Sequence, residues 1–376
     1  MPREPRSWWI YQGLEKRNEA NALSPELARL GVPPPWRRFG KQARQDRGAT
    51  FEPETAEIDR VNAALLLRRP LLVTGRPGTG KTSLTYAVAH ELGLEPVLRW
   101  SVTSRTQRQD GLYRYDAIGR LQDTPRAGQH EGEPPDIGNY LTLGPLGTAL
   151  FGRILQTEDG EPVLTEEGKP VVYPRILLID EIDKSDIDLP NDLLHLFEEG
   201  EFEIPELARL ESREYQENPK GEKGFWIKPD DYNDPLSFQC QKKLFIPADG
   251  RVRCPDNGFP LVIMTSNGER EFPPAFMRRC LQLEMQLPNE DKLKRIVERH
   301  FALHPDYGKK VAYINDLITQ FLDRRDGKTD GRRQDLAADQ LLNAVHLVLE
   351  NIDPTRKLDR EMLDALWQPL SGAEAL

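Results

Sequence analysis

The stretch LLVTGRPGTGKTSL, Leu71–Leu84, carries the strongest pattern in this sequence. An apolar run stops at Gly75, a loop of small residues follows, and Lys81 and Thr82 come directly after it. The residues Gly75–Thr82, GRPGTGKT, match the phosphate-loop pattern G-x-x-x-x-G-K-[ST] at every fixed position. The loop also lies between an expected buried strand and an expected helix, which is the context that this pattern needs. The sequence therefore predicts a site for a nucleotide triphosphate rather than a plain glycine-rich turn.

The residue types in this loop have physical roles. Gly78 and Gly80 let the backbone curl so that successive amides point inward and form an anion nest. The helix that begins near Lys81 adds the positive end of its dipole. The Lys81 ammonium can reach the β- and γ-phosphates, and the Thr82 hydroxyl can ligate Mg²⁺. The predicted nucleotide-binding residues of the loop are Gly75, Arg76, Pro77, Gly78, Thr79, Gly80, Lys81, Thr82 and Ser83.

A second motif, RILLIDEIDKSD, is an apolar strand that ends in Asp180 and Glu181. Two carboxylates at the end of a buried strand need a reason, although a strand that simply ends in solvated acids is the plain alternative. We expect Asp180 to hold Mg²⁺, directly or through water, together with Thr82. We expect Glu181 to polarise the water that attacks the γ-phosphate. The glutamate favours a hydrolase over a kinase, because a kinase must exclude water.

The apolar strands predict the fold class. PLLVTG, EPVLRWSVT, RILLID and PLVIMTSN are short apolar runs that alternate with helical patterns. This alternation predicts an α/β fold with a parallel sheet covered by helices on both faces. In the helix after the phosphate loop, Leu84, Val88 and Leu92 are expected on one apolar face, and Gly93 fits a C-terminal cap.

The chain divides into three expected regions. Residues 1–50 form a basic arm rich in proline and tryptophan, residues 51–287 an α/β core, and residues 288–376 a helical lid domain. Two long stretches, at about 104–150 and 201–258, interrupt the core and are read as functional insertions. The arm is either a linker that packs on its neighbour through Trp36 and Phe39, or a segment that contacts a partner or the adenine side of a bound nucleotide.

Composition excludes some classes of protein. The 61 acidic and 51 basic residues give a net charge of -10, a poor match for a dedicated nucleic-acid binder. The three cysteines form no C-x-x-C pair, which indicates reduced thiols in a cytoplasm. The N-terminus shows no apolar signal region. The apolar runs are far shorter than the roughly 20 residues of a membrane helix, so we expect a cytoplasmic protein without a membrane span.

Four motifs in this order, GRPGTGKT, LLIDEIDKS, VIMTSN and PPAFMRRC, resemble the AAA+ ATPases and, within them, the MoxR-like group. LTLGPLGTAL also looks like the MoxR pattern, and the resemblance spans roughly residues 50–350. It implies a P-loop NTPase core with β-hairpin insertions and a C-terminal all-α lid. It further implies ATP and Mg²⁺ as ligands and a ring of subunits, expected to be a hexamer. The partner implied is a remodelled protein, reached in some cases through a von Willebrand factor A adaptor.

The resemblance assigns further site residues. Asn267 falls where the family keeps its sensor-one residue, which helps to position the attacking water; a plain strand-end asparagine is the alternative. Arg278 and Arg279 match the segment with the arginine finger, which acts in trans on the γ-phosphate. Cys280 replaces the aromatic residue usual after these arginines, so which arginine is the finger stays open.

The resemblance also implies a sensor-two arginine, either Arg332 or Arg333, reaching from the lid to the nucleotide; two solvated arginines before a helix are the alternative. The insertions correspond to hairpins that face the pore or the substrate side of a ring. In the first of them, Tyr113 and Tyr115 are either exposed grips for a substrate or part of the core.

Two other functional readings remain. WRRFGKQARQDR and KKLFIPADGRVR interleave basic and aromatic residues, as the surface of a nucleic-acid motor or of a nucleotide-dependent restriction or defence subunit can. The acidic total makes this alternative weaker, and nucleic acid is not the expected partner. The third reading is a switch that binds ATP to assemble and turns it over only to reset, but Glu181 argues against a scaffold that does not hydrolyse ATP.

Overall fold

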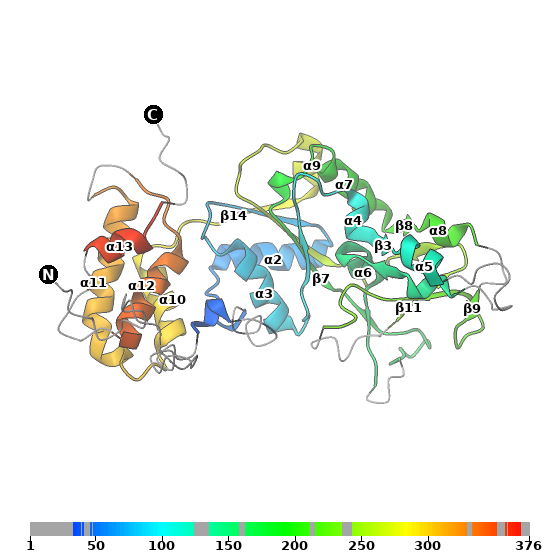
Figure 1. Ribbon diagram of the computed structural model, residues 1–376, viewed down its shortest axis with the longest axis horizontal. Helices are drawn as coiled ribbons and strands as arrows, with labels where there is room; N and C mark the ends of the chain where they lie inside the picture. Colours follow the sequence, from blue (N-terminus) through cyan, green and yellow to red (C-terminus); the bar gives the residue numbers. More distant parts are fainter. Residues whose placement is uncertain are drawn as a thin grey trace, which may run out of the picture. The chain divides into compact units, whose positions relative to one another are not determined.

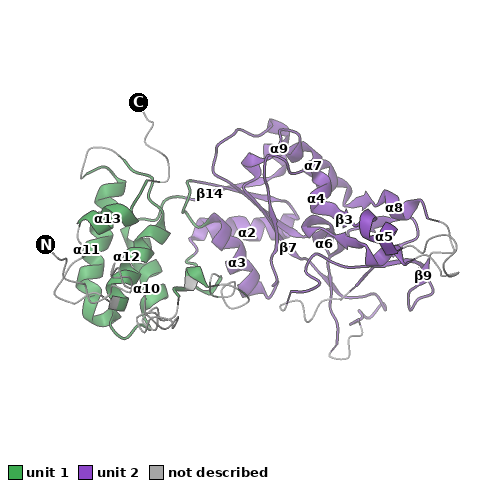
Figure 2. Ribbon diagram, in the orientation of Figure 1, with its two compact units in different colours: residues 1–52, 76–80, 286–376 green, residues 53–75, 81–285 purple. Residues whose placement is uncertain are grey.

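The computed structural model describes residues 33–38, 40, 46, 48–123, 135–157, 162–210, 215–234, 243–328, 333–351, 358 and 360–369 (Figure 1). The chain separates into two compact units, shown in Figure 2. Unit 1 comprises the described parts of residues 1–52, 76–80 and 286–376, and unit 2 those of residues 53–75 and 81–285. The five residues 76–80 of the phosphate loop are thus grouped with the C-terminal helices.

Unit 2 is built on a five-stranded sheet in the order β14-β1-β13-β7-β2. All four neighbouring pairs are parallel. The strands are β1 Leu71–Thr74, β2 Leu98–Ser101, β7 Ile176–Asp180, β13 Leu261–Ser266 and β14 Leu281–Glu284. Every residue of β7 and β13 is buried, as expected for inner parallel strands covered on both faces. The predicted α/β fold with a parallel sheet is confirmed.

The edge strand β14 was not among the four strands expected from the sequence. It lies in register beside β1, with Leu71 opposite Leu281. Its sequence LQLE alternates apolar and polar residues over only four positions, a weak signal compared with the continuous apolar runs of the inner strands. Whether so short a segment forms an edge strand depends on its pairing partner, here β1, rather than on its own sequence.

Helices of unit 2 pack on this sheet. α2 Thr55–Leu67 contacts β1 and β14, α3 Lys81–Leu92 contacts β7 and β13, and α6 Pro145–Phe151 contacts β2 and β7. The apolar face expected for α3 is partly wrong, because Leu84 is buried whereas Leu92 is 47% exposed.

The helix after β7 has residues suited to its start and its end. α7 Leu189–Glu199 has Pro190 in its first turn and ends at Gly200, whose φ of 65° is the left-handed cap conformation that glycine favours. α9 Pro274–Arg279 packs against α7 and leads directly into β14.

The two long interruptions are structured in their described parts. The first includes α4 Arg108–Leu112, β3 Tyr113–Tyr115, α5 Ala117–Asp123, η3 Ile137–Asn139 and β4 Leu141–Leu143. The second includes β8 Glu201–Glu203, α8 Pro205–Ala208, β9 Gln216–Glu217, β10 Lys223–Ile227, β11 Leu244–Pro247 and β12 Arg251–Arg253. Between them lie β5 Arg153–Ile154, β6 Val172–Tyr173 and η4 Ile182–Lys184. β3 and β4 are antiparallel, and so are β8 and β12.

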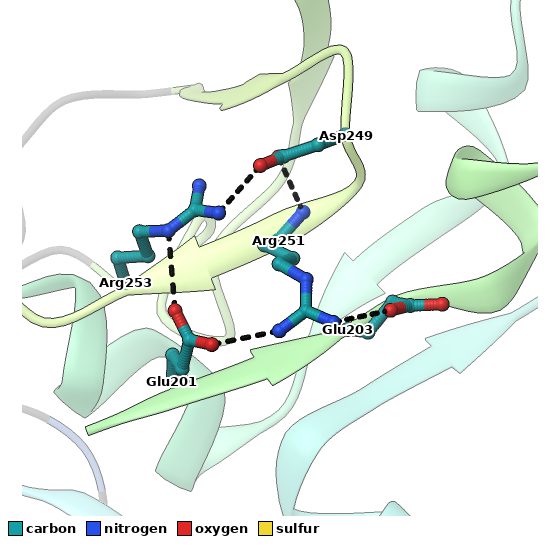
Figure 3. A network of polar contacts seen from close by, with 5 residues as sticks. All are labelled: Glu201, Glu203, Asp249, Arg251 and Arg253. Carbon is teal, nitrogen blue, oxygen red and sulfur yellow. Dashed lines mark hydrogen bonds and ion pairs between the residues drawn. The ribbon is translucent and has the colours of Figure 1, made fainter. Parts of the chain in front are cut away.

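The β8–β12 pair carries a network of ion pairs (Figure 3). Arg251 binds Glu201 at 2.7 Å and Glu203 at 2.9 Å. Arg253 binds Glu201 at 3.2 Å and Asp249 at 2.5 Å, and this bond lowers the pKa of the Asp249 carboxyl. Opposite charges facing each other across antiparallel strands stabilise the pairing, so this network holds the two strands together.

Unit 1 contains α10 Glu290–Phe301, α11 Tyr307–Arg325, α12 Ala338–Asn351 and α13 Arg360–Leu366 around its own apolar core. The short helix η2 Pro35–Arg37 supplies Trp36, whose indole donates to Asn343 Oδ1 at 2.9 Å and meets the Phe301 ring edge-on. Trp36 therefore packs on the helices of its own unit, which matches the linker reading of the arm. Phe39 lies outside the described residues.

Candidate active site

The phosphate loop follows β1. Gly78 and Gly80 have φ values of 78° and 92°, which a side chain at Cβ disfavours. The Thr79 hydroxyl donates to Arg76 O at 2.9 Å and closes the turn. Within unit 1, a Cβ on Gly78 would lie 2.2 Å from the Cβ of Ala337. The glycine at this position is required both by its backbone conformation and by its neighbour.

Lys81 is the first residue of α3, and only 7% of it is exposed. Its ammonium donates to Gly75 O at 2.7 Å. Burial lowers the pKa of Lys81, and the carboxylates of Asp183, Asp180 and Glu181 oppose this shift. The ammonium is thus held by the carbonyl of Gly75, the first residue of the loop motif, and is close to acidic groups.

Asp180 ends β7 and accepts three side-chain hydrogen bonds. The Thr82 hydroxyl donates to Oδ1 at 3.2 Å, and the Thr265 hydroxyl donates to the same oxygen at 2.7 Å. Arg99 Nη2 donates to Oδ2 at 2.7 Å. The structure therefore brings Thr82 and Asp180, which are 98 positions apart in the chain, into direct contact.

Glu181 has a φ of 61° and a ψ of 49°, a left-handed conformation unusual for a residue other than glycine. Its amide donates to the Thr265 hydroxyl at 2.9 Å. Its carboxylate is 45% exposed and pairs with Lys184 at 3.0 Å. Backbone strain of this kind persists where the surroundings fix it, and here Thr265 fixes it.

Asn267 follows the end of β13, next to β7 in the sheet. Its amide donates to Asp183 Oδ2 at 2.9 Å, and the amide of Glu269 donates to the same oxygen at 3.2 Å. Because the carboxyl ends of parallel strands meet at one edge, Asn267 and Glu181 lie at the same edge of the sheet. Asp183 links their two loops.

The site fits a hard divalent cation. Mg²⁺ takes oxygen ligands and is usually bound by one or two carboxylates plus substrate phosphates rather than by an all-protein cage. Thr82 and Asp180 together offer hydroxyl and carboxylate oxygens at one point. No group of three or more His, Cys, Asp or Glu side chains that could hold a metal occurs in the described part of the chain.

The arginines expected as the finger and as sensor two lie in different surroundings. Arg278 and Arg279 are exposed on α9, and Arg279 pairs with Glu198 of α7. Arg333 is exposed in the segment before α12, whereas Arg332 lies outside the described residues. Within unit 1, Arg76 of the phosphate loop pairs at 2.6 Å with Asp335, two residues after Arg333.

One family model, the AAA domain (dynein-related subfamily), matches residues 70–280. This span is more than half of the 376-residue chain. The chain belongs to this AAA family. It is accordingly an AAA+ ATPase, and the identity indicated by the motifs is confirmed at this level. The match does not single out the MoxR-like group.

Among solved structures, the AAA protein is similar to a candidate ATPase from Cytophaga hutchinsonii, with 12% identity and a TM-score of 0.34. The match covers 73% of this chain and 61% of that one, so this chain spans less than two thirds of that chain's length. A likeness of this extent carries no conclusion about function. The comparison with curated proteins found no match. None of the helices in the described ranges has the length and apolar character needed to cross a membrane.

Sequence reasoning missed three residues of the AAA site. Thr265 stands inside the quoted motif VIMTSN, two residues before Asn267, and Asp183 stands inside LLIDEIDKS. Both could have been suspected from position, since Thr265 is a polar residue near the end of buried β13 and Asp183 lies in η4 directly after buried β7. Arg99 gave no signal beyond the alternation of LRWS, because its partner Asp180 is distant in sequence.

Tyr113 and Tyr115 of the first insertion were expected either as exposed grips for a substrate or as part of the core. Tyr113 is 6% exposed, and its hydroxyl donates to Glu206 at 2.8 Å. Burial and this bond raise the pKa of Tyr113. Tyr115 is half-buried against the core. The reading of Tyr113 as an exposed grip is wrong, and core packing is the correct one.

Proposed function

We propose that this AAA+ protein hydrolyses ATP with Mg²⁺ at the site of Lys81, Asp180 and Glu181, and that it works as a ring that remodels a protein partner. The observation that carries the proposal is the contact between the Thr82 hydroxyl and Asp180 at 3.2 Å, beside the buried Lys81. A hydroxyl from the phosphate-loop motif and a carboxylate from β7, which β13 separates from β1 in the sheet, meet where the metal of a phosphate-bound nucleotide is needed.

The residues divide the chemistry among them. Thr82 and Asp180 would hold Mg²⁺, which neutralises charge on the β- and γ-phosphates when it is bound. Lys81 binds the same phosphates as a compact cation. Glu181, held at a fixed backbone conformation by Thr265, accepts a proton from the attacking water. Asn267 orients that water from the neighbouring strand.

Assembly into a ring is supported by the arginines. Arg278 and Arg279 make no hydrogen bond or ion pair with Lys81, Asp180 or Glu181 among the described residues. In the described residues, Arg278 and Arg279 are thus not engaged with the site of their own subunit, and in this proposal they act on the γ-phosphate bound by a neighbour. For the lid, the Arg76–Asp335 pair supports Arg333 as sensor two, since it ties the segment beside Arg333 to the phosphate loop.

A protein substrate and the MoxR-like subgroup are supported by the motifs and by the two insertions. The nucleic-acid alternative is weakened by Figure 3, because Arg251 and Arg253, the basic residues of KKLFIPADGRVR on β12, are neutralised by Glu201, Glu203 and Asp249. Arginines engaged in this way do not form a free basic surface for phosphates.

The test is steady-state ATP hydrolysis by the full chain with Mg²⁺ and with EDTA, combined with light scattering in the presence of nucleotide. We expect turnover only with Mg²⁺ and a nucleotide-dependent closed oligomer. A monomer that hydrolyses ATP at full rate would contradict the ring. Turnover that rises steeply with added DNA at low salt would favour the nucleic-acid motor instead.

A further inference from the structure

The Asp180 carboxylate, which the proposed function assigns to Mg²⁺, is already bound to a cation of the chain. Arg99 Nη2 donates to Asp180 Oδ2 at 2.7 Å, whereas Oδ1 accepts, among the described residues, from the neutral hydroxyls of Thr82 and Thr265. In the described ranges, Arg99 is the one cationic side chain that bonds directly to this carboxylate. Alongside the nearby Lys81 ammonium, it supplies positive charge where the metal would otherwise supply it.

The two partners differ in their surroundings. The Asp180 side chain is 10% exposed, whereas the Arg99 side chain is 47% exposed. On the edge strand β2 the buried residues Leu98 and Trp100 alternate with the exposed Arg99 and Ser101, so the Arg99 side chain reaches solvent. A buried carboxylate is costly without a counter-charge, but an exposed guanidinium is solvated when it leaves.

We propose that Arg99 is a resident counter-ion for Asp180, which neutralises the carboxylate before nucleotide arrives and gives way to Mg²⁺ when it does. This inference rests on the proposed function, because it takes Asp180 as a metal-binding residue. Arg99 is a positioning residue: it keeps Asp180 in place without touching substrate. It also competes with the metal for one oxygen, and its charge repels the approaching Mg²⁺. Arg99 therefore stabilises the nucleotide-free site, and it also raises the Mg²⁺ concentration that binding requires.

The size of the effect follows from the exposure of Arg99. Ion pairs with a solvated partner are weak, so loss of the arginine should lower the Mg²⁺ concentration for half-maximal binding by about two- to fivefold. The nucleotide-free protein should become less stable, because Asp180 then has only hydroxyl partners. Both changes come from the same pair and should appear together.

The experiment uses the full chain with Arg99→Gln, Arg99→Lys and, as a matched control, Arg105→Gln, an exposed arginine further along the same segment. A fluorescent, slowly hydrolysed ATP analogue is titrated at increasing Mg²⁺ and again in EDTA. Melting temperature is measured in EDTA without nucleotide.

For Arg99→Gln we expect a lower Mg²⁺ midpoint, unchanged analogue binding in EDTA and a lower melting temperature. Arg99→Lys should lie between this variant and the wild type, and Arg105→Gln should match the wild type.

An unchanged Mg²⁺ midpoint for Arg99→Gln would overturn the inference. So would an equal loss of analogue affinity with and without Mg²⁺, which would make Arg99 a phosphate ligand. If the wild type itself binds the analogue equally well with Mg²⁺ and in EDTA, the metal role of Asp180 fails and the inference fails with it. The wild-type titration therefore separates failure of the proposed function from failure of the counter-ion alone.

Discussion

The hydroxyl of Thr265 joins the two acidic residues at the end of β7: it donates to Asp180 Oδ1 at 2.7 Å and accepts from the Glu181 amide at 2.9 Å. One side chain of β13 thereby fixes both the carboxylate expected at the metal and the left-handed backbone of the expected general base. Thr265 is 2% exposed, so water cannot easily replace these bonds.

Thr265→Val should impair the site without emptying the core, because valine keeps the shape but not the hydroxyl. We expect about 1–3 kcal/mol lower stability, from the unpaired Glu181 amide and the lost Asp180 bond, and a lower kcat. Thr265→Ser keeps the hydroxyl and is the control. Denaturant unfolding and ATP turnover measure the two effects; wild-type kcat in the valine variant would show that Thr265 does not position these groups.

Lys81→Ala should abolish nucleotide binding, because it removes the cation held at the phosphate loop by the bond to Gly75 O. The loss should be about 100-fold or more in affinity. Equilibrium binding of a fluorescent ATP analogue measures it, with circular dichroism as the check on folding. Near-normal affinity in a folded variant would contradict the role of Lys81.

Glu181→Gln should bind ATP but turn it over about 10²- to 10⁴-fold more slowly, since the amide cannot accept a proton from water. Glu199→Gln, an exposed glutamate on α7, is the matched control and should leave turnover unchanged. Wild-type turnover in Glu181→Gln would remove this residue from the mechanism. The same variant, used as a trap and recovered from native lysate for mass spectrometry, would identify retained partners.

Mixing two inactive variants tests the arginine in trans. Arg279→Ala lacks the finger and Glu181→Gln lacks the base, so a mixed ring contains some interfaces with both groups intact. We expect partial recovery of turnover on mixing, and the same experiment with Arg278→Ala tells which arginine acts. Native mass spectrometry confirms subunit exchange; mixed rings without any recovery would refute action in trans.

Gly78→Ala should weaken nucleotide binding and stability. The new methyl group would meet Ala337 at 2.2 Å, and the φ of 78° is strained for alanine, at a cost of about 1–3 kcal/mol. Gly168→Ala, which has a similar φ of 76° but nothing within 4 Å of the added methyl group, is the control outside the site. Thermal melting and analogue binding report the two effects, and a Gly78→Ala protein that matches its control in both would contradict the close packing of the loop.

Acid should destabilise unit 1 through His300, which contacts Trp36. Burial lowers the pKa of His300 from 6.5 to about 4. Because the unfolded chain takes up the proton first, stability present above pH 6.5 is lost as pH falls toward 4, by up to about 3 kcal/mol. His346 is shifted in the same direction by burial. Urea unfolding at pH 7 and pH 4.5 should show a smaller difference for His300→Phe than for wild type; an equal difference would exclude His300 as the cause.

Local sequence determined the parts of this protein whose signals are contiguous. The phosphate loop, the apolar strands β1, β7 and β13, the capped helix α7 and the family itself follow from short runs of residues, because glycine freedom, burial and capping act over a few positions. The weak strand β14 and the buried state of Tyr113 did not follow, since each depends on a partner elsewhere in the chain.

Only the tertiary structure decided how the acids of the site are held. Three elements supply the partners of Asp180: Arg99, Thr82 and Thr265. Each partner is 81 to 98 positions from Asp180 in the chain, and no periodic pattern in the sequence predicts such contacts. A parallel sheet places the ends of distant strands side by side, so the order β14-β1-β13-β7-β2 determines which polar side chains meet. Short runs of sequence therefore identify the residues expected to bind a phosphate, whereas the strand order decides which distant side chains pair with them and fix their orientation.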